Sequence, residues 1–327
     1  MSLNLQSKRK LNDGNEIPVL GFGVYQSNPG DETEQAVLWA LEFTMIRLAT
    51  ATLIRLHVST QYAIVASSEH RGSWLNVWQS ANSVGYYNEE SVGSALKKWL
   101  ASNAQIACFT TLVKTNSDTY YKKIWVTTKL WDTDHGFDKA KEACEESLRK
   151  LGLDYIDLYL IHSPIPGKKL RTESWKALEE LKKEGKVRSI GVSNYGVHHM
   201  KELLEIATIK PTINQIEVTP YQVREELCKF CTDNDVVVEA FSPLTMGLKL
   251  KEPRLNKIAE KYGKQPAQIL IRWSLQRGIV PLPKSVTKQR IIDNSNVFDF
   301  EISAEDMEAL TKMDEYLVTE WDPTKLP

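Results

Sequence analysis

From residue 124 onward, the hydrophobic and polar positions follow one repeated order: a short run rich in β-branched residues, a polar turn and an amphipathic stretch. The stretch 138–151 illustrates the helical part, because small or apolar residues recur there at i, i+3, i+4 and i+7 and Gly152 supplies a C-terminal stop. The order predicts strands at 124–129, 155–163, 187–194, 212–219, 236–244 and 278–285, and helices at about 138–151, 171–184, 197–207, 222–234, 254–262 and 266–276.

Apolar runs that alternate with helices are typical of parallel strands buried on both faces. The N-terminal third adds a predicted strand at 19–25 and a helix at about 31–43. One early strand and six later ones leave a (β/α)8 barrel one strand short of closure. We therefore expect the eighth strand between residues 44 and 88.

The first residues predict a separate element. Asp13 and Gly14 form a turn signal between short alternating segments, which predicts a small β-hairpin before the first barrel strand. The complete prediction is an α/β protein, a (β/α)8 TIM barrel with an N-terminal β-hairpin, folded as a single domain over residues 1–327.

Composition narrows the class of partner. The chain has 41 Lys and Arg against 42 Asp and Glu, a net charge of −1, which argues against a nucleic-acid surface. Four cysteines are too few and too scattered for a disulfide framework, and the start does not read as a secretory signal. The most membrane-like stretch, 45–67, is interrupted by Arg47, Arg55 and His57. We predict a cytoplasmic protein with neither a nucleic-acid nor a membrane partner.

Several blocks spread along the chain resemble the aldo-keto reductase family, and their order and spacing carry the resemblance. The blocks are Leu20-Gly-Phe-Gly-Val-Tyr-Gln26, Tyr86-Tyr-Asn-Glu-Glu-Ser-Val-Gly93, Val126-Thr-Thr-Lys-Leu-Trp131, Asp157-Leu-Tyr-Leu-Ile-His-Ser-Pro164, Gly191-Val-Ser-Asn194, Asn214-Gln-Ile-Glu217, Phe241-Ser-Pro-Leu244 and Pro283-Lys-Ser-Val-Thr287. This resemblance implies a (β/α)8 barrel that uses a nicotinamide dinucleotide.

Three residues match the catalytic positions of the family. Carbonyl reduction needs a proton donor, a cation that makes this donor more acidic, and a group that orients the substrate. The resemblance implies Tyr86 as the general acid, Lys129 as its cationic neighbour and His162 as the orienting residue. An ordinary tyrosine, with a pKa of about 10, is a poor acid at neutral pH, and a nearby ammonium stabilises its phenolate.

The cofactor residues are also implied by the resemblance. Ser193, Asn194 and Gln215 match positions that hold the nicotinamide carboxamide, and Phe241 stands where the family usually has a tyrosine that stacks on the nicotinamide ring. Cations and hydroxyl groups after the last strand favour NADP(H) over NAD(H), because the extra phosphate needs positive charge. The further predicted cofactor residues are Ser242, Leu244, Lys284, Ser285, Val286, Thr287, Arg290, Asp293 and Asn294.

The remaining candidates are aromatic residues and a cysteine pair. Tyr25 and Trp131 are predicted walls of the substrate pocket, together with the tail around Trp321. Cys228 and Cys231 have the spacing of a redox or metal pair, but they are predicted to form one apolar stripe of a helix. We predict no metal site.

The family pattern breaks in two places. The resemblance implies a strand with Arg-x-Ile-Asp-Thr-Ala, whose Asp pairs with the catalytic lysine, but no Asp occurs from 44 through 85. Residues 46–57 either supply a substitute strand, which we favour, or form a helix outside the barrel. Residues 101–123 also lack a family counterpart. We hypothesise that 44–85 and 101–123 are mis-translated non-coding sequence or a degenerate copy, which sequencing of the mature transcript would test.

The resulting functional prediction has two forms. The first is an NADP(H)-dependent aldo-keto reductase that reduces a small carbonyl substrate, an aldehyde or ketone with sugars among the candidates, to an alcohol. The second is a catalytically impaired or silent NADP(H)-binding protein, because the Asp is missing from the site.

Overall fold

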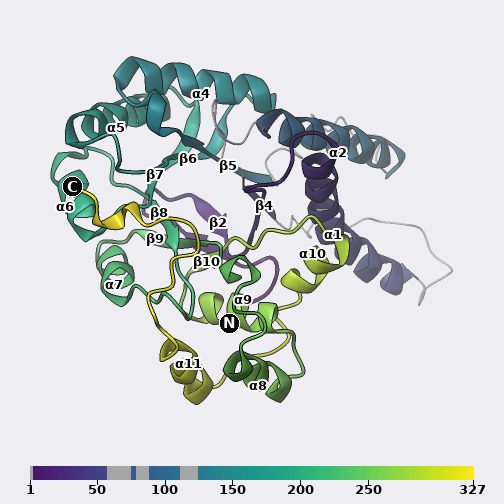
Figure 1. Ribbon diagram of the computed structural model, residues 1–327. Helices are drawn as coiled ribbons and strands as arrows, with labels where there is room; N and C mark the ends of the chain where they lie inside the picture. Colours follow the sequence, from purple (N-terminus) through teal and green to yellow (C-terminus); the bar gives the residue numbers. More distant parts are fainter. Residues whose placement is uncertain (1–2, 57–74, 79–87, 111–123) are drawn as a thin grey trace.

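The computed structural model describes residues 3–56, 75–78, 88–110 and 124–327, with side chains described for 3–43, 88–101 and 124–327. Eight parallel strands form one sheet in the order β3 to β10 (Figure 1). The strands are β3 (Gly21–Gly23), β4 (Leu75–Trp78), β5 (Ile124–Leu130), β6 (Ile156–Ile161), β7 (Val187–Ser193), β8 (Ile213–Glu217), β9 (Val237–Phe241) and β10 (Val280–Pro281).

The sheet closes on itself. Gly23 of β3 forms a parallel bridge with Lys284, just after β10, and the Gly23 N–H donates to the Pro283 carbonyl over 3.0 Å. A Cβ at Gly23 would lie 3.1 Å from the Leu282 carbonyl oxygen, so the two strands come together where a side chain would be tight. This closure confirms the predicted (β/α)8 barrel.

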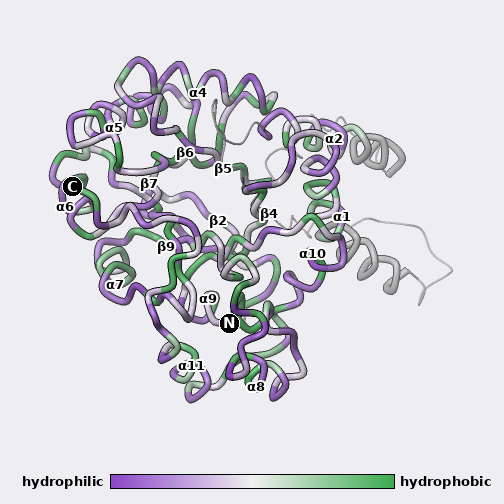
Figure 2. Tube along the Cα trace, viewed as in Figure 1, coloured by the Kyte–Doolittle hydropathy of each residue, from purple (hydrophilic) through white to green (hydrophobic). Residues whose placement is uncertain are grey.

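Helices surround the barrel, and Figure 2 shows hydrophilic and hydrophobic residues intermixed along α4 and α5, as amphipathic helices require. In α4, Ala140, Cys144, Leu148 and Leu151 are buried, and Gly152 ends the helix with φ of 66°. The helices are α1 (Asp31–Leu56), α2 (Glu89–Thr110), α4 (Phe137–Leu151), α5 (Lys168–Lys183), α6 (Val197–Ile206), α7 (Glu225–Asp233), α8 (Pro253–Lys261), α9 (Pro266–Gln276), α10 (Lys288–Ser295) and α11 (Ala304–Thr311), with short 3-10 helices at Asp132–Asp134, Thr245–Gly247 and Pro323–Lys325.

The predicted hairpin closes one end of the barrel. Strands β1 (Lys8–Lys10) and β2 (Glu16–Pro18) pair antiparallel. Leu11 and Ile17 pack in one buried cluster with barrel residues that include Ile213, Val237 and Val280, the first residues of β8, β9 and β10. The hairpin therefore covers the N-terminal end of the barrel and leaves its C-terminal end for a site.

The structure describes part of the segment 44–85, in which the family pattern breaks. The favoured prediction, a substitute strand at 46–57, is wrong for residues 46–56, because these residues belong to helix α1. Residue 57 lies outside the described residues. Apolar residues at 46, 49, 53 and 56 have helical spacing, which explains the outcome. The eighth strand is β4, inside the expected interval, and it pairs with β3 and β5. In the second atypical segment, 101–110 belongs to α2, and 111–123 lies outside the described residues.

Within the part of the chain that the structure describes, no helix combines the length and apolar character needed to cross a membrane. The single-domain organisation stays a prediction.

Candidate active site

A cavity of about 710 Å³ opens at the C-terminal ends of the barrel strands. Parallel strands in a closed barrel all end at the same mouth, so the side chains that follow them meet there. The strands contribute Tyr25 after β3, Lys129 in β5, His162 after β6, Ser193 in β7, Gln215 in β8, Phe241 in β9 and Lys284 after β10.

Lys129 brings a desolvated ammonium group to this cavity. It lies one residue before the end of β5, and its side chain is only partly accessible. Burial lowers the pKa of Lys129 to about 8, although the negative charge of Glu239 acts in the opposite direction. No ion pair joins Lys129 to a carboxylate among the residues with described side chains. A lysine with this pKa is charged at neutral pH but close to its titration range.

His162 is held between aromatic rings. Its imidazole stacks on Trp131 with ring centroids 4.2 Å apart, and Trp321 lies on another side at 5.6 Å. Its Nδ1 lies 3.9 Å from a carboxylate oxygen of Asp132. Burial lowers the pKa of His162, and this effect outweighs the opposing contribution of Asp132. The imidazole is therefore neutral at pH 7 and can both donate and accept hydrogen bonds.

Amide and hydroxyl groups form the next part of the wall. The Asn194 side chain donates to the His162 carbonyl over 2.9 Å, and Ser193 Oγ donates to the Gln215 carbonyl over 2.8 Å. Asn194 adopts a left-handed conformation with φ of 62°, which asparagine tolerates better than most residues. These bonds fix the backbone that carries the polar groups facing the cavity.

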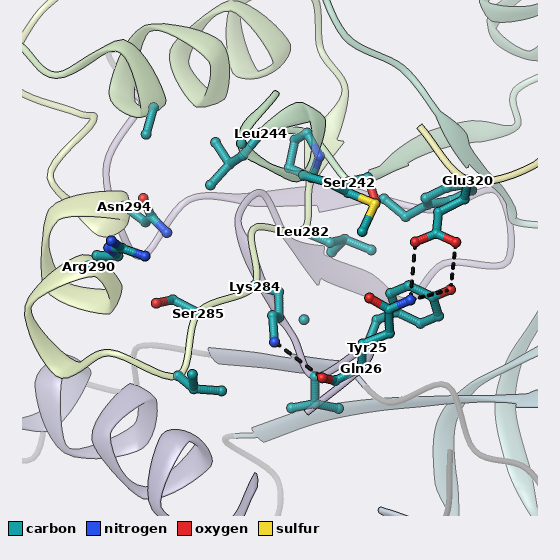
Figure 3. A pocket seen from close by; sticks show the side chains of 18 of the residues that line it. Tyr25, Gln26, Ser242, Leu244, Leu282, Lys284, Ser285, Arg290, Asn294 and Glu320 are labelled. Carbon is teal, nitrogen blue, oxygen red and sulfur yellow. Dashed lines mark hydrogen bonds between the residues drawn. The ribbon is translucent and has the colours of Figure 1, made fainter. Parts of the chain in front are cut away.

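One part of the cavity wall suits an anion. Lys284, Ser285, Thr287 and Arg290 line it, and α10 begins directly after Thr287 (Figure 3). Two cations, two hydroxyl groups and a helix N-terminus together match the donors that bind phosphate groups. Together with the amides and the Phe241 ring that line the same cavity, this set fits a nicotinamide dinucleotide phosphate.

The cavity brings together most of the predicted residues. Tyr86 lies outside the described residues. Trp131 does not line the cavity; it stacks on His162 and lines a second cavity of about 330 Å³, so its role as a pocket wall stays a prediction. The predicted residues that line the main cavity are Tyr25, Lys129, His162, Ser193, Asn194, Gln215, Phe241, Ser242, Leu244, Lys284, Ser285, Val286, Thr287, Arg290, Asp293, Asn294 and Trp321.

Sequence reasoning missed Gln26 and Glu320, which both line the cavity and are joined by a hydrogen bond. Glu320 accepts hydrogen bonds from the Tyr25 hydroxyl over 3.0 Å and from Gln26 Nε2 over 3.2 Å (Figure 3). Gln26 immediately follows Tyr25, which gave a local signal. Glu320 lies in the C-terminal tail and gave none beyond its neighbour Trp321.

The cysteine pair shows no sign of chemistry. Cys228 and Cys231 are free and buried on α7, and burial raises the pKa of Cys228 to about 11 and that of Cys231 to about 12. This confirms the apolar stripe. In the described residues, no group of three or more His, Cys, Asp or Glu side chains could hold a metal ion.

Comparisons with known proteins agree with this geometry. The family model described as "Aldo/keto reductase family" matches residues 75–315, so this chain belongs to the aldo/keto reductase family, as the motif blocks implied. The match includes 75–85, the last part of the segment that the sequence marked as atypical. Members are oxidoreductases, and relatives in the family act on carbonyl groups.

Individual relatives cover nearly the whole chain. It is 36% identical to the uncharacterized oxidoreductase YtbE of Bacillus subtilis, over 99% of this chain and 98% of the relative. It is also 36% identical to the glyoxal reductase of that organism, over 95% and 94%. Among solved structures, the Bombyx mori aldo-keto reductase in complex with NADP is 32% identical, with a TM-score of 0.75 and coverage of 98% and 96%.

Proposed function

We propose that this protein reduces an aldehyde or ketone to an alcohol with NADPH as the reductant. One observation carries the proposal: Lys129 and His162 line the same cavity as Lys284 and Arg290. A cavity of this size and polarity can hold an extended ligand with a reacting group at one end and phosphates at the other.

The cofactor preference rests on charge. Lys284 and Arg290 would hold the phosphate that distinguishes NADP(H) from NAD(H), with hydroxyl groups of Ser285 and Thr287 beside it. Gln215 would contact the nicotinamide carboxamide, and the remaining predicted cofactor residues line the same wall. A relative with a bound NADP supports this assignment.

When bound, NADPH supplies the hydride for the carbonyl carbon. Tyr86 donates a proton to the carbonyl oxygen, and Lys129 stabilises the phenolate that remains. His162 is neutral, so its imidazole N–H donates a hydrogen bond to the carbonyl oxygen and orients it. These roles assign acid, charge and orientation to three separate side chains.

The substrate class is a small carbonyl compound in the cytoplasm. Because one relative is a glyoxal reductase, glyoxal and methylglyoxal head the panel, followed by simple aldehydes, ketones and aldoses. Tyr25 and Trp131 are the proposed aromatic contacts of the substrate.

The test is NADPH oxidation, followed by absorbance, with that panel. We expect Tyr86→Phe to reduce kcat by two or more orders of magnitude, since a general acid contributes about 10²–10⁴, while the Kd for NADPH is retained. The matched control is the neighbouring Tyr87→Phe, which should keep its turnover. Equal turnover in wild type and Tyr86→Phe would refute the assignment.

A second candidate is a catalytically silent NADP(H)-binding protein. It is favoured by the absence of any Asp from 44 through 85 and by the lack of an ion-pair partner for Lys129 among the residues with described side chains. NADPH binding by fluorescence titration, without turnover of any panel member, would select it. Binding of NADH with equal affinity would argue against both candidates.

A further inference from the structure

Glu239 is a carboxyl group sealed inside the barrel, below the cavity. It is 0% exposed and lies in β9, in register with Gln215 of β8 and Val280 of β10. Residues in register on neighbouring parallel strands point to the same side of the sheet, so Glu239 and Gln215 both face the barrel interior. An ionisable group at such a position costs stability unless it is hydrogen-bonded or paired.

Its hydrogen bond determines how Gln215 presents its amide. Gln215 Nε2 donates to Glu239 Oε2 over 3.0 Å, while Glu239 Oε1 has no hydrogen-bond partner among the described residues. This hydrogen bond uses the amide NH₂ of Gln215, which therefore faces Glu239. The Gln215 carbonyl oxygen is then the end left for the cavity, which Gln215 lines.

Glu239 also acts on Lys129. Strands β5 and β9 lie across the closed sheet from each other, and the two charges attract without a direct ion pair. Burial raises the pKa of Glu239 to about 8, against the opposing effects of Gln215 and Lys129. Gln215 from β8 and Lys129 from β5 are the polar or charged groups that affect Glu239 among the described residues, and the β10 neighbour Val280 is apolar. Glu239 and Lys129 therefore titrate in the same range, just above neutral pH.

We propose that Glu239 is a positioning residue of the cofactor site: it holds Gln215 with its carbonyl oxygen toward the nicotinamide carboxamide, and it places a buried acidic group opposite Lys129 across the barrel interior. This inference rests on the proposed function, because it assumes that Gln215 contacts the cofactor. It supplies a source of negative charge for Lys129 other than the Asp that is missing from 44–85.

The first experiment measures Lys129 directly, in the full chain without cofactor. The ¹³Cε shift of Lys129, assigned with Lys129→Arg, is followed against pH by NMR in wild type and Glu239→Gln. The wild-type pKa should lie near 8, and Glu239→Gln should lower it, because the attraction is lost while desolvation remains. An unchanged or higher pKa in Glu239→Gln would overturn the role of Glu239 toward Lys129.

The control is Glu179→Gln. Glu179 is also a buried acidic residue, with 5% exposure, but it lies on α5 and accepts hydrogen bonds from Trp175 Nε1 and the N–H groups of Thr208 and Ile209. It should leave the Lys129 titration unchanged. If Glu179→Gln shifted Lys129 as much as Glu239→Gln, the effect would be a general consequence of lost charge, and the proposal would fail.

The second experiment measures NADPH affinity by fluorescence. Glu239→Asp keeps the charge but shortens the side chain, so it should lose the Gln215 hydrogen bond and weaken binding about threefold to tenfold, the value of one hydrogen bond. It should also keep the Lys129 pKa closer to wild type than Glu239→Gln does. In a Gln215→Ala background, Glu239→Asp should cause no further loss.

If Glu239 had a purely structural role, the losses of affinity from Gln215→Ala and Glu239→Asp would be additive in the double variant. That result would overturn the role of Glu239 toward Gln215. Wild-type affinity in Glu239→Asp would overturn it equally. If wild type itself failed to bind NADPH, the proposed function and the Gln215 role would both fall, while the Lys129 titration would still decide the other half.

Discussion

The C-terminal tail offers the sharpest test of how this barrel shapes its cavity. Asp322 in the tail forms an ion pair with Arg224, with 2.9 Å between the nearest atoms, and the two side chains are only 10% and 6% exposed. Asp322 also accepts hydrogen bonds from the Thr324 N–H over 3.2 Å and the Tyr316 hydroxyl over 2.6 Å. The neighbouring residue Trp321 lines the cavity beside His162, so this ion pair holds one wall in place.

We predict that Asp322→Asn loosens the tail and leaves the barrel folded. Removing one partner of a buried ion pair costs about 3–5 kcal/mol. Arg224 retains acceptors at the Glu217 carbonyl and at Thr324 Oγ1, so we take the lower value, about 3 kcal/mol. Every 1.4 kcal/mol is a factor of ten, so about 3 kcal/mol corresponds to roughly hundredfold faster local opening.

Native-state hydrogen exchange, read residue by residue by NMR, measures this opening. The amides of Thr319 and Thr324 should exchange about a hundredfold faster in Asp322→Asn, while those of β6 and β7 stay protected. The control, Asp233→Asn, makes the same chemical change in an exposed pair with Lys229 and should have almost no effect. Unchanged exchange at Thr319 and Thr324 would refute the role of the ion pair in holding the tail.

Two predictions concern the stability of the barrel. Gly93→Ala would place a Cβ 2.7 Å from the Leu151 carbonyl oxygen where α2 packs on α4, and it should lower the free energy of unfolding by about 1–3 kcal/mol in urea titrations; an unchanged midpoint would contradict this close packing. Burial raises the pKa of Asp13, but hydrogen bonds from Lys182, Ser189 and Asn15 lower it by more, so the net pKa lies below the ordinary 3.8. Because the folded pKa is the lower one, this stabilisation is present above pH 3.8 and is lost as the pH falls, so wild type should lose more stability than Asp13→Asn between pH 5 and pH 3. Equal losses would show that Asp13 contributes nothing to the acid limb.

The barrel itself was predictable because its strands are continuous apolar runs between amphipathic helices. From residue 124 onward, each predicted strand and helix appears within a few residues of its expected bounds. Helices α10 and α11 were missed. The α10 stretch has little apolar periodicity, while α11 carries a capping signal that was not used: Ser303 accepts a hydrogen bond from the Asp306 N–H.

The site was predictable where chemistry follows a strand end and harder to predict where tertiary packing brings groups together. Lys129, His162 and Gln215 lie in or after strands, so a motif was enough to locate them. Glu320 reaches the cavity from a tail that Glu217 holds at Thr319 and Arg224 holds at Asp322, and no local pattern encodes those contacts. Glu239 did carry a signal: a single acidic residue between Val238 and Ala240 in an otherwise apolar strand.

The atypical segment 44–85 affects fold and chemistry differently. Barrel closure is made by backbone hydrogen bonds, and β4 pairs in register with β3 through Gly21 and Asn76 and with β5 through Leu75 and Ile124. Backbone pairing accepts most side chains, so an altered sequence can still supply the second strand. The pKa of Lys129 depends instead on burial and on carboxylate charge, which Glu239 supplies among the described residues and which no backbone group can replace. A change in this segment can therefore preserve the barrel and the cofactor cavity while it reduces turnover, which is why binding and turnover must be measured separately in this protein.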